Sequence, residues 1–197
     1  MIEPIFATPI YKSDTRYEFT KEQLDCLSSL ELMENRGNTV TKDKNIFNNP
    51  ILSDLRNWCL ANVNAFAEQL GREKGVEFYI TNSWYNKSKP HESHHSHMHP
   101  NSIFSAVLYV DGPDVPTFFY NNGAFANFTF YDKNKGNQFT ANKVGIRNEP
   151  GRLVLFPSSL THDVDTNRGN SDRHTISFNT FIKGKFGDYN DLTELTI

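Results

Sequence analysis

The sequence predicts a mainly β protein, a sandwich or jelly roll with N-terminal helices packed on the outside of one sheet. Three observations support this fold class. The chain has 197 residues, a length that suits one domain with a sizeable core. Aromatic residues make up 13% of it, with 16 Phe and 8 Tyr, and such residues favour strands. After residue 75, short strand-like segments alternate with turns rich in Gly, Asn, Pro and Asp, a pattern typical of sandwiches and jelly rolls.

Two helices are expected in the first 75 residues. Thr20-Lys-Glu-Gln23 has the spacing of a capping box, so the first helix should run from about Lys21 to Met33. The second should begin at Ser53, a candidate N-cap, and end before Gly71. Its apolar residues recur on one face: Leu55, Cys59, Val63 (or Phe66) and Leu70.

The strands are expected in order along the rest of the chain, each as a short apolar or alternating run bounded by turn residues. They cover residues 76–86, 102–110, 117–120, 126–131, 143–147, 152–156, 162–165 and 174–182. The aromatic and polar segment 123–136 is either a hairpin or a flap over a substrate. We therefore expect one domain, with helical support over residues 1–75, a β core over 76–183 and a tail over 184–197.

Composition and charge exclude several classes of partner. The formal net charge of -3 offers no basic footprint for nucleic acid or an anionic membrane. No apolar run approaches the ~20 residues needed to span a bilayer, and the N-terminus lacks the pattern of a signal peptide. Cys26 and Cys59 occupy core positions of the expected helices, which favours buried thiols over a disulfide. We expect a soluble, cytoplasmic protein, and a homodimer is compatible with these features.

Residues 91–99 form a histidine-rich run that holds five of the seven histidines. Imidazole is a common ligand of divalent transition metals, so the run predicts a metal site, although a solvated loop that binds metal without catalysis is an alternative. Alternate residues of a strand point to one side, so His95, His97 and His99 should share a face and His94 should point away. Two of those three can chelate one ion, and His91 should be exposed.

Two downstream residues favour a catalytic site. His162 follows a strand that ends at Pro157 and a short loop, a position that can deliver a third ligand from an adjacent strand. Arg173 opens the next expected strand, and a guanidinium held beside a metal suits a bidentate grip on a carboxylate. An ordinary ion pair of Arg173 with Asp163 or Asp165 is the alternative. His174 should point to the opposite side of its strand.

Five motifs follow in order along about half of the chain: Ser83-Trp-Tyr-Asn86, His97-Met-His-Pro100, Ser105-Ala-Val-Leu-Tyr109, Phe156-Pro-Ser-Ser-Leu-Thr-His-Asp-Val164 and Arg173-His-Thr-Ile-Ser-Phe-Asn179. Their order resembles the iron(II)- and 2-oxoglutarate-dependent oxygenases, and most closely a branch frequent in marine phages and bacteria. The nearest functional relatives by motif are the prolyl-hydroxylase-like enzymes. A phage-encoded enzyme would act in the host cytoplasm.

The resemblance implies a double-stranded β-helix, a distorted jelly roll of the cupin type, and a hydroxylase that consumes 2-oxoglutarate and O₂ and releases succinate and CO₂. It implies that His97, His99 and His162 bind Fe(II) and that Arg173 anchors the distal carboxylate of 2-oxoglutarate. Three further residues would contribute to cosubstrate binding: Thr175, Tyr109 and Asn86. Three protein ligands on one face leave two positions for the cosubstrate and one for O₂.

The chain departs from the wider superfamily at one ligand, because His99 stands where a carboxylate is usual. The ligand set is then neutral, and His95 remains an alternative to His99. Two other functions stay open, a non-catalytic jelly-roll module with a structural metal and a cupin-like three-histidine dioxygenase that does not use 2-oxoglutarate. By analogy with the prolyl hydroxylases, we expect a peptidyl or free amino-acid side chain as the substrate.

Overall fold

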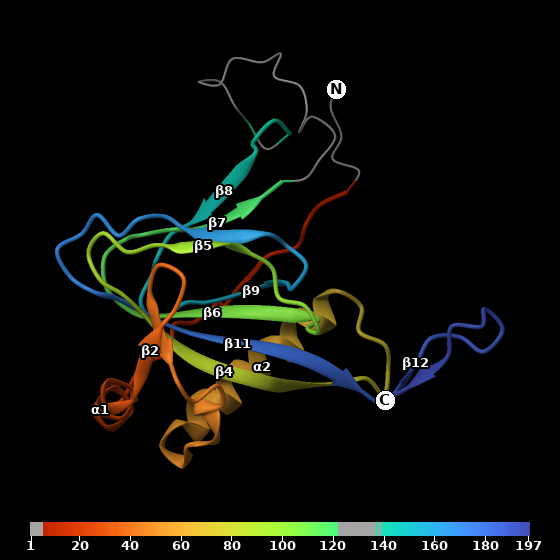
Figure 1. Ribbon diagram of the computed structural model, residues 1–197. Helices are drawn as coiled ribbons and strands as arrows, with labels where there is room; N and C mark the ends of the chain where they lie inside the picture. The colour runs from red at the N-terminus through yellow and green to blue at the C-terminus, as the bar shows by residue number, and fades with distance from the viewer. Residues whose placement is uncertain (1–5, 122–136, 138) are drawn as a thin grey trace.

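Two antiparallel sheets and two α-helices dominate the fold, which we describe from a computed structural model (Figure 1). The structure describes residues 6–121, 137 and 139–197. The expected strand over residues 126–131 and the expected flap over 123–136 lie outside these residues. Within them, the expected mainly β fold with helices on one sheet is confirmed.

The larger sheet has seven strands in the order β1-β9-β6-β11-β4-β3-β2. Their bounds in that order are Tyr11–Lys12, Leu153–Pro157, Phe104–Asp111, Arg173–Lys183, Glu77–Ser88, Thr39–Thr41 and Leu32–Glu34. The smaller sheet has the order β5-β10-β7-β8, with bounds His94–His97, His162–Val164, Thr117–Tyr120 and Lys143–Ile146. A separate hairpin joins β12 (Lys185–Phe186) to β13 (Leu195–Thr196). In Figure 1 the smaller sheet lies above the larger one.

The first helix, α1 (Lys21–Ser29), begins at the predicted capping box. The Thr20 hydroxyl accepts from the Gln23 backbone N–H at 3.2 Å, and the Thr20 N–H donates to Gln23 Oε1 at 3.1 Å. The helix ends four residues before the expected Met33, since the chain there turns into β2. Strands β1, β2 and β3 were not predicted, because runs of two or three residues are too short to show a period of two.

The second helix, α2 (Ser53–Gln69), follows two 3-10 turns, η1 (Ile46–Asn48) and η2 (Pro50–Leu52). Ser53 is therefore the first helical residue and not the N-cap, and Leu70 is 48% exposed instead of buried, so both expectations are wrong. Gly71, with φ of +80°, stands just past the end as predicted. Both cysteines are free and buried, also as predicted.

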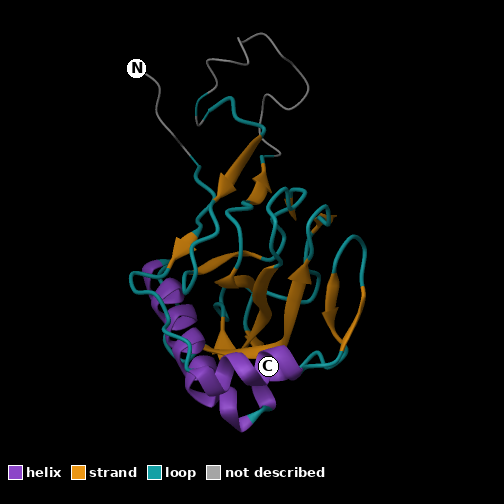
Figure 2. Cartoon of the chain, turned by 90° about the vertical axis from the view of Figure 1, so that its left-hand side faces the viewer, coloured by secondary structure: helices purple, strands orange, loops and turns teal. Residues whose placement is uncertain are grey.

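Alternation along the central strands divides the core into two layers. Leu108 of β6 and Ile176 of β11 pack toward the helices, which cover the outer face of the larger sheet (Figure 2). Val107 of β6 and Phe156 of β9 pack between the two sheets. Each fully buried aliphatic side chain of this kind stabilises the fold by roughly 1.5–3 kcal/mol. The odd-numbered residues of β11 consequently face the space between the sheets.

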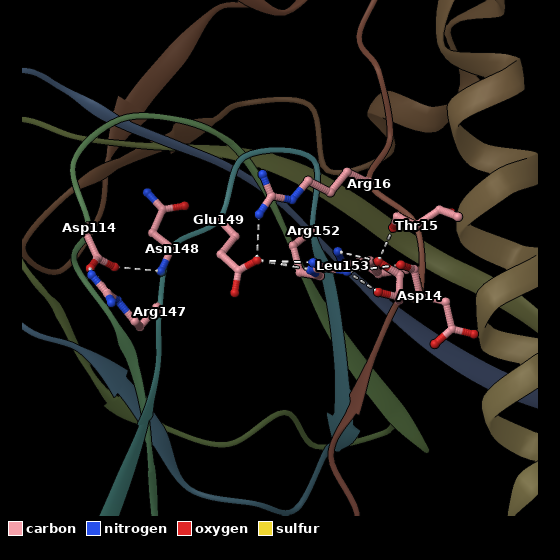
Figure 3. Close-up of polar contacts among 10 residues, drawn as sticks. Asp14, Thr15, Arg16, Asp114, Arg147, Asn148, Glu149, Arg152 and Leu153 are labelled. Atoms are coloured by element: carbon pink, nitrogen blue, oxygen red, sulfur yellow. Dashed lines mark hydrogen bonds and ion pairs between the residues drawn. The ribbon is translucent and has the colours of Figure 1, made fainter.

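The turn between β8 and β9 ties the N-terminal segment to the edge of the larger sheet (Figure 3). The Glu149 carboxylate accepts from Arg16 at 3.0 Å and from Arg152 at 3.2 Å. Nearby, Asp114 accepts from the Asn148 backbone N–H at 3.1 Å and pairs with Arg147. Exposed ion pairs add little stability, but these contacts set the path of the chain into β1 and β9.

Among the described residues, no helix is long and apolar enough to cross a membrane. The expected cytoplasmic location and homodimer stay predictions.

Candidate metal centre

Three histidines expected as ligands come together between the sheets. Strand β10 pairs with β5 so that His162 lies opposite His97, and His99 follows just after β5. The candidate ligand atoms of these three residues lie within 4.8 Å of one another. Nε2 of His99 is 3.2 Å from Nε2 of His162. We call His97, His99 and His162 the inner triad.

Backbone contacts set the tautomers of two of these rings. Nδ1 of His97 is 2.7 Å from the His95 carbonyl oxygen, and Nδ1 of His162 is 2.9 Å from the Leu160 carbonyl oxygen. A carbonyl oxygen can only accept, so each Nδ1 carries the proton and donates it. Each Nε2 therefore keeps a free lone pair, which is the arrangement that a metal-binding histidine needs.

The histidines of this cluster are held in their neutral form. Burial, with the neighbouring imidazoles, lowers the pKa of His162 to about 3 and that of His99 to about 4. Burial also lowers the pKa of His97. Neutral imidazole is the form that binds metal. Two ligand nitrogens at right angles, each about 2.1 Å from an ion, lie roughly 3 Å apart, so the His99–His162 distance fits a divalent transition metal.

The structure corrects the expectation for His94, which does not point away from the cluster. In the pairing of β5 with β10, His97 is opposite His162 and His94 is opposite Val164. Three residue steps along β5 thus match two along β10, which is a β-bulge. The bulge brings His94 to the same side of the strand as His97. Their ring centroids are 4.6 Å apart.

The remaining histidines lie as expected. His91 is exposed, outside the cluster. His174 faces away from Arg173, and its Nδ1 is 2.6 Å from the Tyr85 hydroxyl.

Arg173 is a buried cation that lines the same pocket as the histidines. It is 3% exposed, its Nε donates to the Val115 carbonyl at 3.3 Å, and its Nη2 donates to Thr117 Oγ1 at 3.3 Å. The guanidinium carbon lies 5.4 Å from the centre of the Tyr109 ring. Within the described part of the chain, no acidic side chain forms an ion pair with Arg173, so the alternative pair with Asp163 or Asp165 is not formed. A buried charge without a counter-ion is costly.

Inward-facing residues of β4 and β11 line the same pocket as the imidazoles and Arg173. Thr175 and Asn86 line this pocket, as the sequence led us to expect. The Asn86 side chain accepts from Trp84 Nε1 at 3.1 Å and donates to Ser177 Oγ at 3.0 Å, so its orientation is fixed. Tyr109 does not line the pocket, because it is fully buried beneath it.

Sequence reasoning missed Thr117, which links these groups. Its Oγ1 accepts from the Tyr109 hydroxyl at 3.0 Å as well as from Arg173. Thr117 is 2% exposed and lines the pocket. The only signal in the sequence is its place at the start of a short strand, which many structural threonines share.

A β sandwich that holds three converging imidazoles and an unpaired arginine between its sheets defines the class of jelly-roll metalloenzymes. Residues 82–179 match the family described as "Putative 2OG-Fe(II) oxygenase", and this chain belongs to that family. The enzyme is a 2OG-Fe(II)-dependent oxygenase, with Fe(II) and 2-oxoglutarate as its cofactors. The match spans the five motifs from Ser83 to Asn179. No curated protein matches the chain.

Solved structures share the fold at low sequence identity. An oxidoreductase of the 2OG-Fe(II) oxygenase family from Burkholderia pseudomallei has 13% identity and a TM-score of 0.61, over 87% of this chain and 83% of that one. HygX from Streptomyces hygroscopicus, solved with nickel, 2-oxoglutarate and hygromycin B, has 10% identity and a TM-score of 0.58, over 88% and 82%.

A Pseudomonas putida prolyl-4-hydroxylase has 14% identity and a TM-score of 0.51, over 79% of each chain. These likenesses confirm the expected jelly-roll fold. The expected phage origin stays a prediction.

Proposed function

We propose that the enzyme hydroxylates its substrate with Fe(II) held by His97, His99 and His162, and with 2-oxoglutarate anchored by Arg173. The observation that carries this proposal is one pocket lined by three neutral imidazoles and by a buried guanidinium that has no counter-ion among the described residues. When bound, iron, 2-oxoglutarate and O₂ supply the oxidation of a substrate C–H bond, with release of succinate and CO₂.

Arg173 would recognise the carboxylate of 2-oxoglutarate that lies farther from the metal. Its planar guanidinium presents paired N–H donors, and the contacts with Val115 and Thr117 hold it in one orientation. The hydroxyl of Thr175, two residues along β11 on the same face, would add a further hydrogen bond. A bound carboxylate would supply the counter-ion that Arg173 lacks, so the cosubstrate would relieve an existing electrostatic cost.

Asn86 and Tyr109 would contribute in different ways. Asn86 lines the wall of the pocket with its side chain fixed by Trp84 and Ser177, so it can present its remaining N–H to the cosubstrate. Tyr109 would act through Thr117 and the guanidinium, as a positioning residue beneath the pocket.

The substrate would approach from a second pocket, of 380 Å³, which shares His94, His97 and His99 with the first. Asn82 and Asn179 are register partners on β4 and β11 and both line it. Their carbonyl oxygens accept from Thr81 at 3.1 Å and from Ser105 at 2.8 Å. The amide N–H groups are then left as donors for carbonyl or carboxylate oxygens, which supports a peptidyl or free amino-acid substrate.

The experiment that tests this proposal is anaerobic addition of Fe(II) and 2-oxoglutarate, which should give a weak charge-transfer band in the visible. Arg173→Ala should abolish the band at cosubstrate concentrations that saturate the wild type. Arg147→Ala, which removes an exposed arginine paired with Asp114, is the matched control and should keep it.

A band that Arg173→Ala leaves unchanged would contradict the role given to Arg173. A protein whose histidines hold only a structural metal would show no band at all. Conversion of 2-oxoglutarate to succinate by the wild type would add support.

A further inference from the structure

A second group of three histidines adjoins the inner triad and shares His97 with it. The candidate ligand atoms of His94, His95 and His97 also lie within 4.8 Å of one another. Their ring centroids are 5.1 Å apart for His94 and His95, 4.6 Å for His94 and His97, and 4.9 Å for His95 and His97. We call this group the outer triad, and the β-bulge in β5 is what assembles it.

The outer triad has lone pairs that the fold does not use. Nδ1 of His95 is buried and has no hydrogen-bond partner among the described residues, a state that is unfavourable for a polar atom. Nε2 of His94 makes a long contact of 3.4 Å with the Asn35 side-chain amide. A divalent transition metal would satisfy these nitrogens.

The two triads cannot both be filled through His97. Its Nδ1–H donates to the His95 carbonyl, so only Nε2 can bind an ion. An ion at the outer triad and an ion at the inner triad are therefore alternatives, joined by one common ligand. Transfer between the two sites keeps His97 as a ligand and exchanges the nitrogens of His94 and His95 for those of His99 and His162.

The two triads also differ in depth. All three members of the outer triad are half-buried, whereas His162 of the inner triad is 6% exposed. His94 and His95 line two pockets, one of 380 Å³ that they share with residues of β3, β4 and β11 and one of 240 Å³ along the smaller sheet. The 240 Å³ pocket is lined by His94 and His95 but by neither His99 nor His162, so it offers an approach to the outer triad alone.

We propose that the outer triad is an entry site that captures a divalent transition metal from solution and passes it through His97 to the inner triad. The inference rests on the proposed role of the inner triad. Capture beside the final site replaces a search from bulk solution by an intramolecular transfer, which raises the effective metal concentration at the inner triad. The outer triad would then govern the rate of loading and not the final affinity.

The test uses Co(II) as the probe and follows its visible absorption on rapid mixing with the metal-free full chain. His94→Gln combined with His95→Gln should slow loading by about tenfold or more, while equilibrium affinity changes by less than about threefold. His91→Gln, an exposed histidine of the same run, is the matched control and should load at the wild-type rate. Glutamine keeps the approximate size of the side chain, and circular dichroism checks the fold of each variant.

A second arm isolates the outer triad. The His99→Ala/His162→Ala variant should still bind one Co(II), and adding His95→Ala should remove that binding. Wild-type loading rates in the His94/His95 variant, or no Co(II) binding by the His99/His162 variant, would overturn the proposal. The Fe(II) and 2-oxoglutarate band reports separately on the inner triad, so a wild type that binds Co(II) in the order described but gives no band would contradict the proposed function alone.

Discussion

Replacing Arg173 by methionine should have opposite consequences for the free enzyme and for cosubstrate binding. In the free enzyme, Arg173→Met removes a buried charge for which the described structure provides no counter-ion, and such a charge costs several kcal/mol. It also removes two long hydrogen bonds, and a hydrogen bond from a charged donor is worth at most about 1.5–3 kcal/mol. The cation–π contact with Tyr109, which is lost as well, is worth about 0.5–2 kcal/mol. These contributions nearly cancel, so the unfolding free energy should change by less than about 2 kcal/mol.

Cosubstrate binding should respond much more strongly. Loss of one partner of a buried ion pair costs about 3–5 kcal/mol, which corresponds to a Kd for 2-oxoglutarate raised roughly 10²- to 10³-fold or more. A ligand at one hundred times its Kd stabilises a protein by about 2.7 kcal/mol. For a chain of this length that is a rise in Tm of about 5–10 °C.

Thermal unfolding with Ni(II), with and without 2-oxoglutarate, measures both effects in one assay. The wild type and Arg147→Met should show the rise in Tm, and Arg173→Met should not, while its Tm without 2-oxoglutarate stays near that of the wild type. A variant that is strongly destabilised when free yet keeps the full rise would refute the reasoning, because Arg173 would then serve the fold and not the cosubstrate.

Three other predictions concern the fold and the pocket. The unfolding free energy of the metal-free enzyme should fall as the pH drops from 6.5 toward 4. The reason is that His162 takes up a proton in the unfolded chain over this range, whereas in the folded enzyme its pKa is about 3. His162→Gln should reduce the slope of the urea-unfolding free energy against pH by about 1.4 kcal/mol per pH unit, and an unchanged slope would show that His162 is not responsible. Thr117→Val removes an acceptor of Arg173 and should lower the unfolding free energy by about 1–3 kcal/mol and weaken 2-oxoglutarate binding in calorimetry, whereas Thr117→Ser should restore both. Leu55→Ala should lower the free energy of urea unfolding by about 2–5 kcal/mol. Leu70→Ala should lower it much less, because Leu70, although expected on the same apolar face, is 48% exposed. Equal losses of unfolding free energy would contradict the observed buried face of α2.

Much of the β core could be predicted from the sequence, because its strands are long enough to show alternation and are bounded by turn residues. The run 117–120 matches β7 residue for residue, and the expected strands 102–110 and 174–182 differ from β6 and β11 by only one or two residues at each end. Alternation along β11 also placed Arg173 and Thr175 on one face and His174 on the other, as observed.

The same rule failed in the histidine run, for a reason that no local pattern reveals. Strict alternation separates His94 from His97, but the bulge in the pairing of β5 with β10 puts both on one side. A bulge is a property of two paired strands, so it depends on how a distant segment of the chain is aligned. The place of Thr117 beneath Arg173 likewise depends on the contact between two sheets.

By itself, the sequence determined the mainly β class, the family and the chemical character of the site, since strand periodicity and the order of His97, His99, His162 and Arg173 are local features of the chain. Only the tertiary structure decided which imidazoles adjoin, which of their nitrogens are free and whether Arg173 has a counter-ion. Those outcomes follow from strand register and burial, which arise only when segments far apart in the chain pack together.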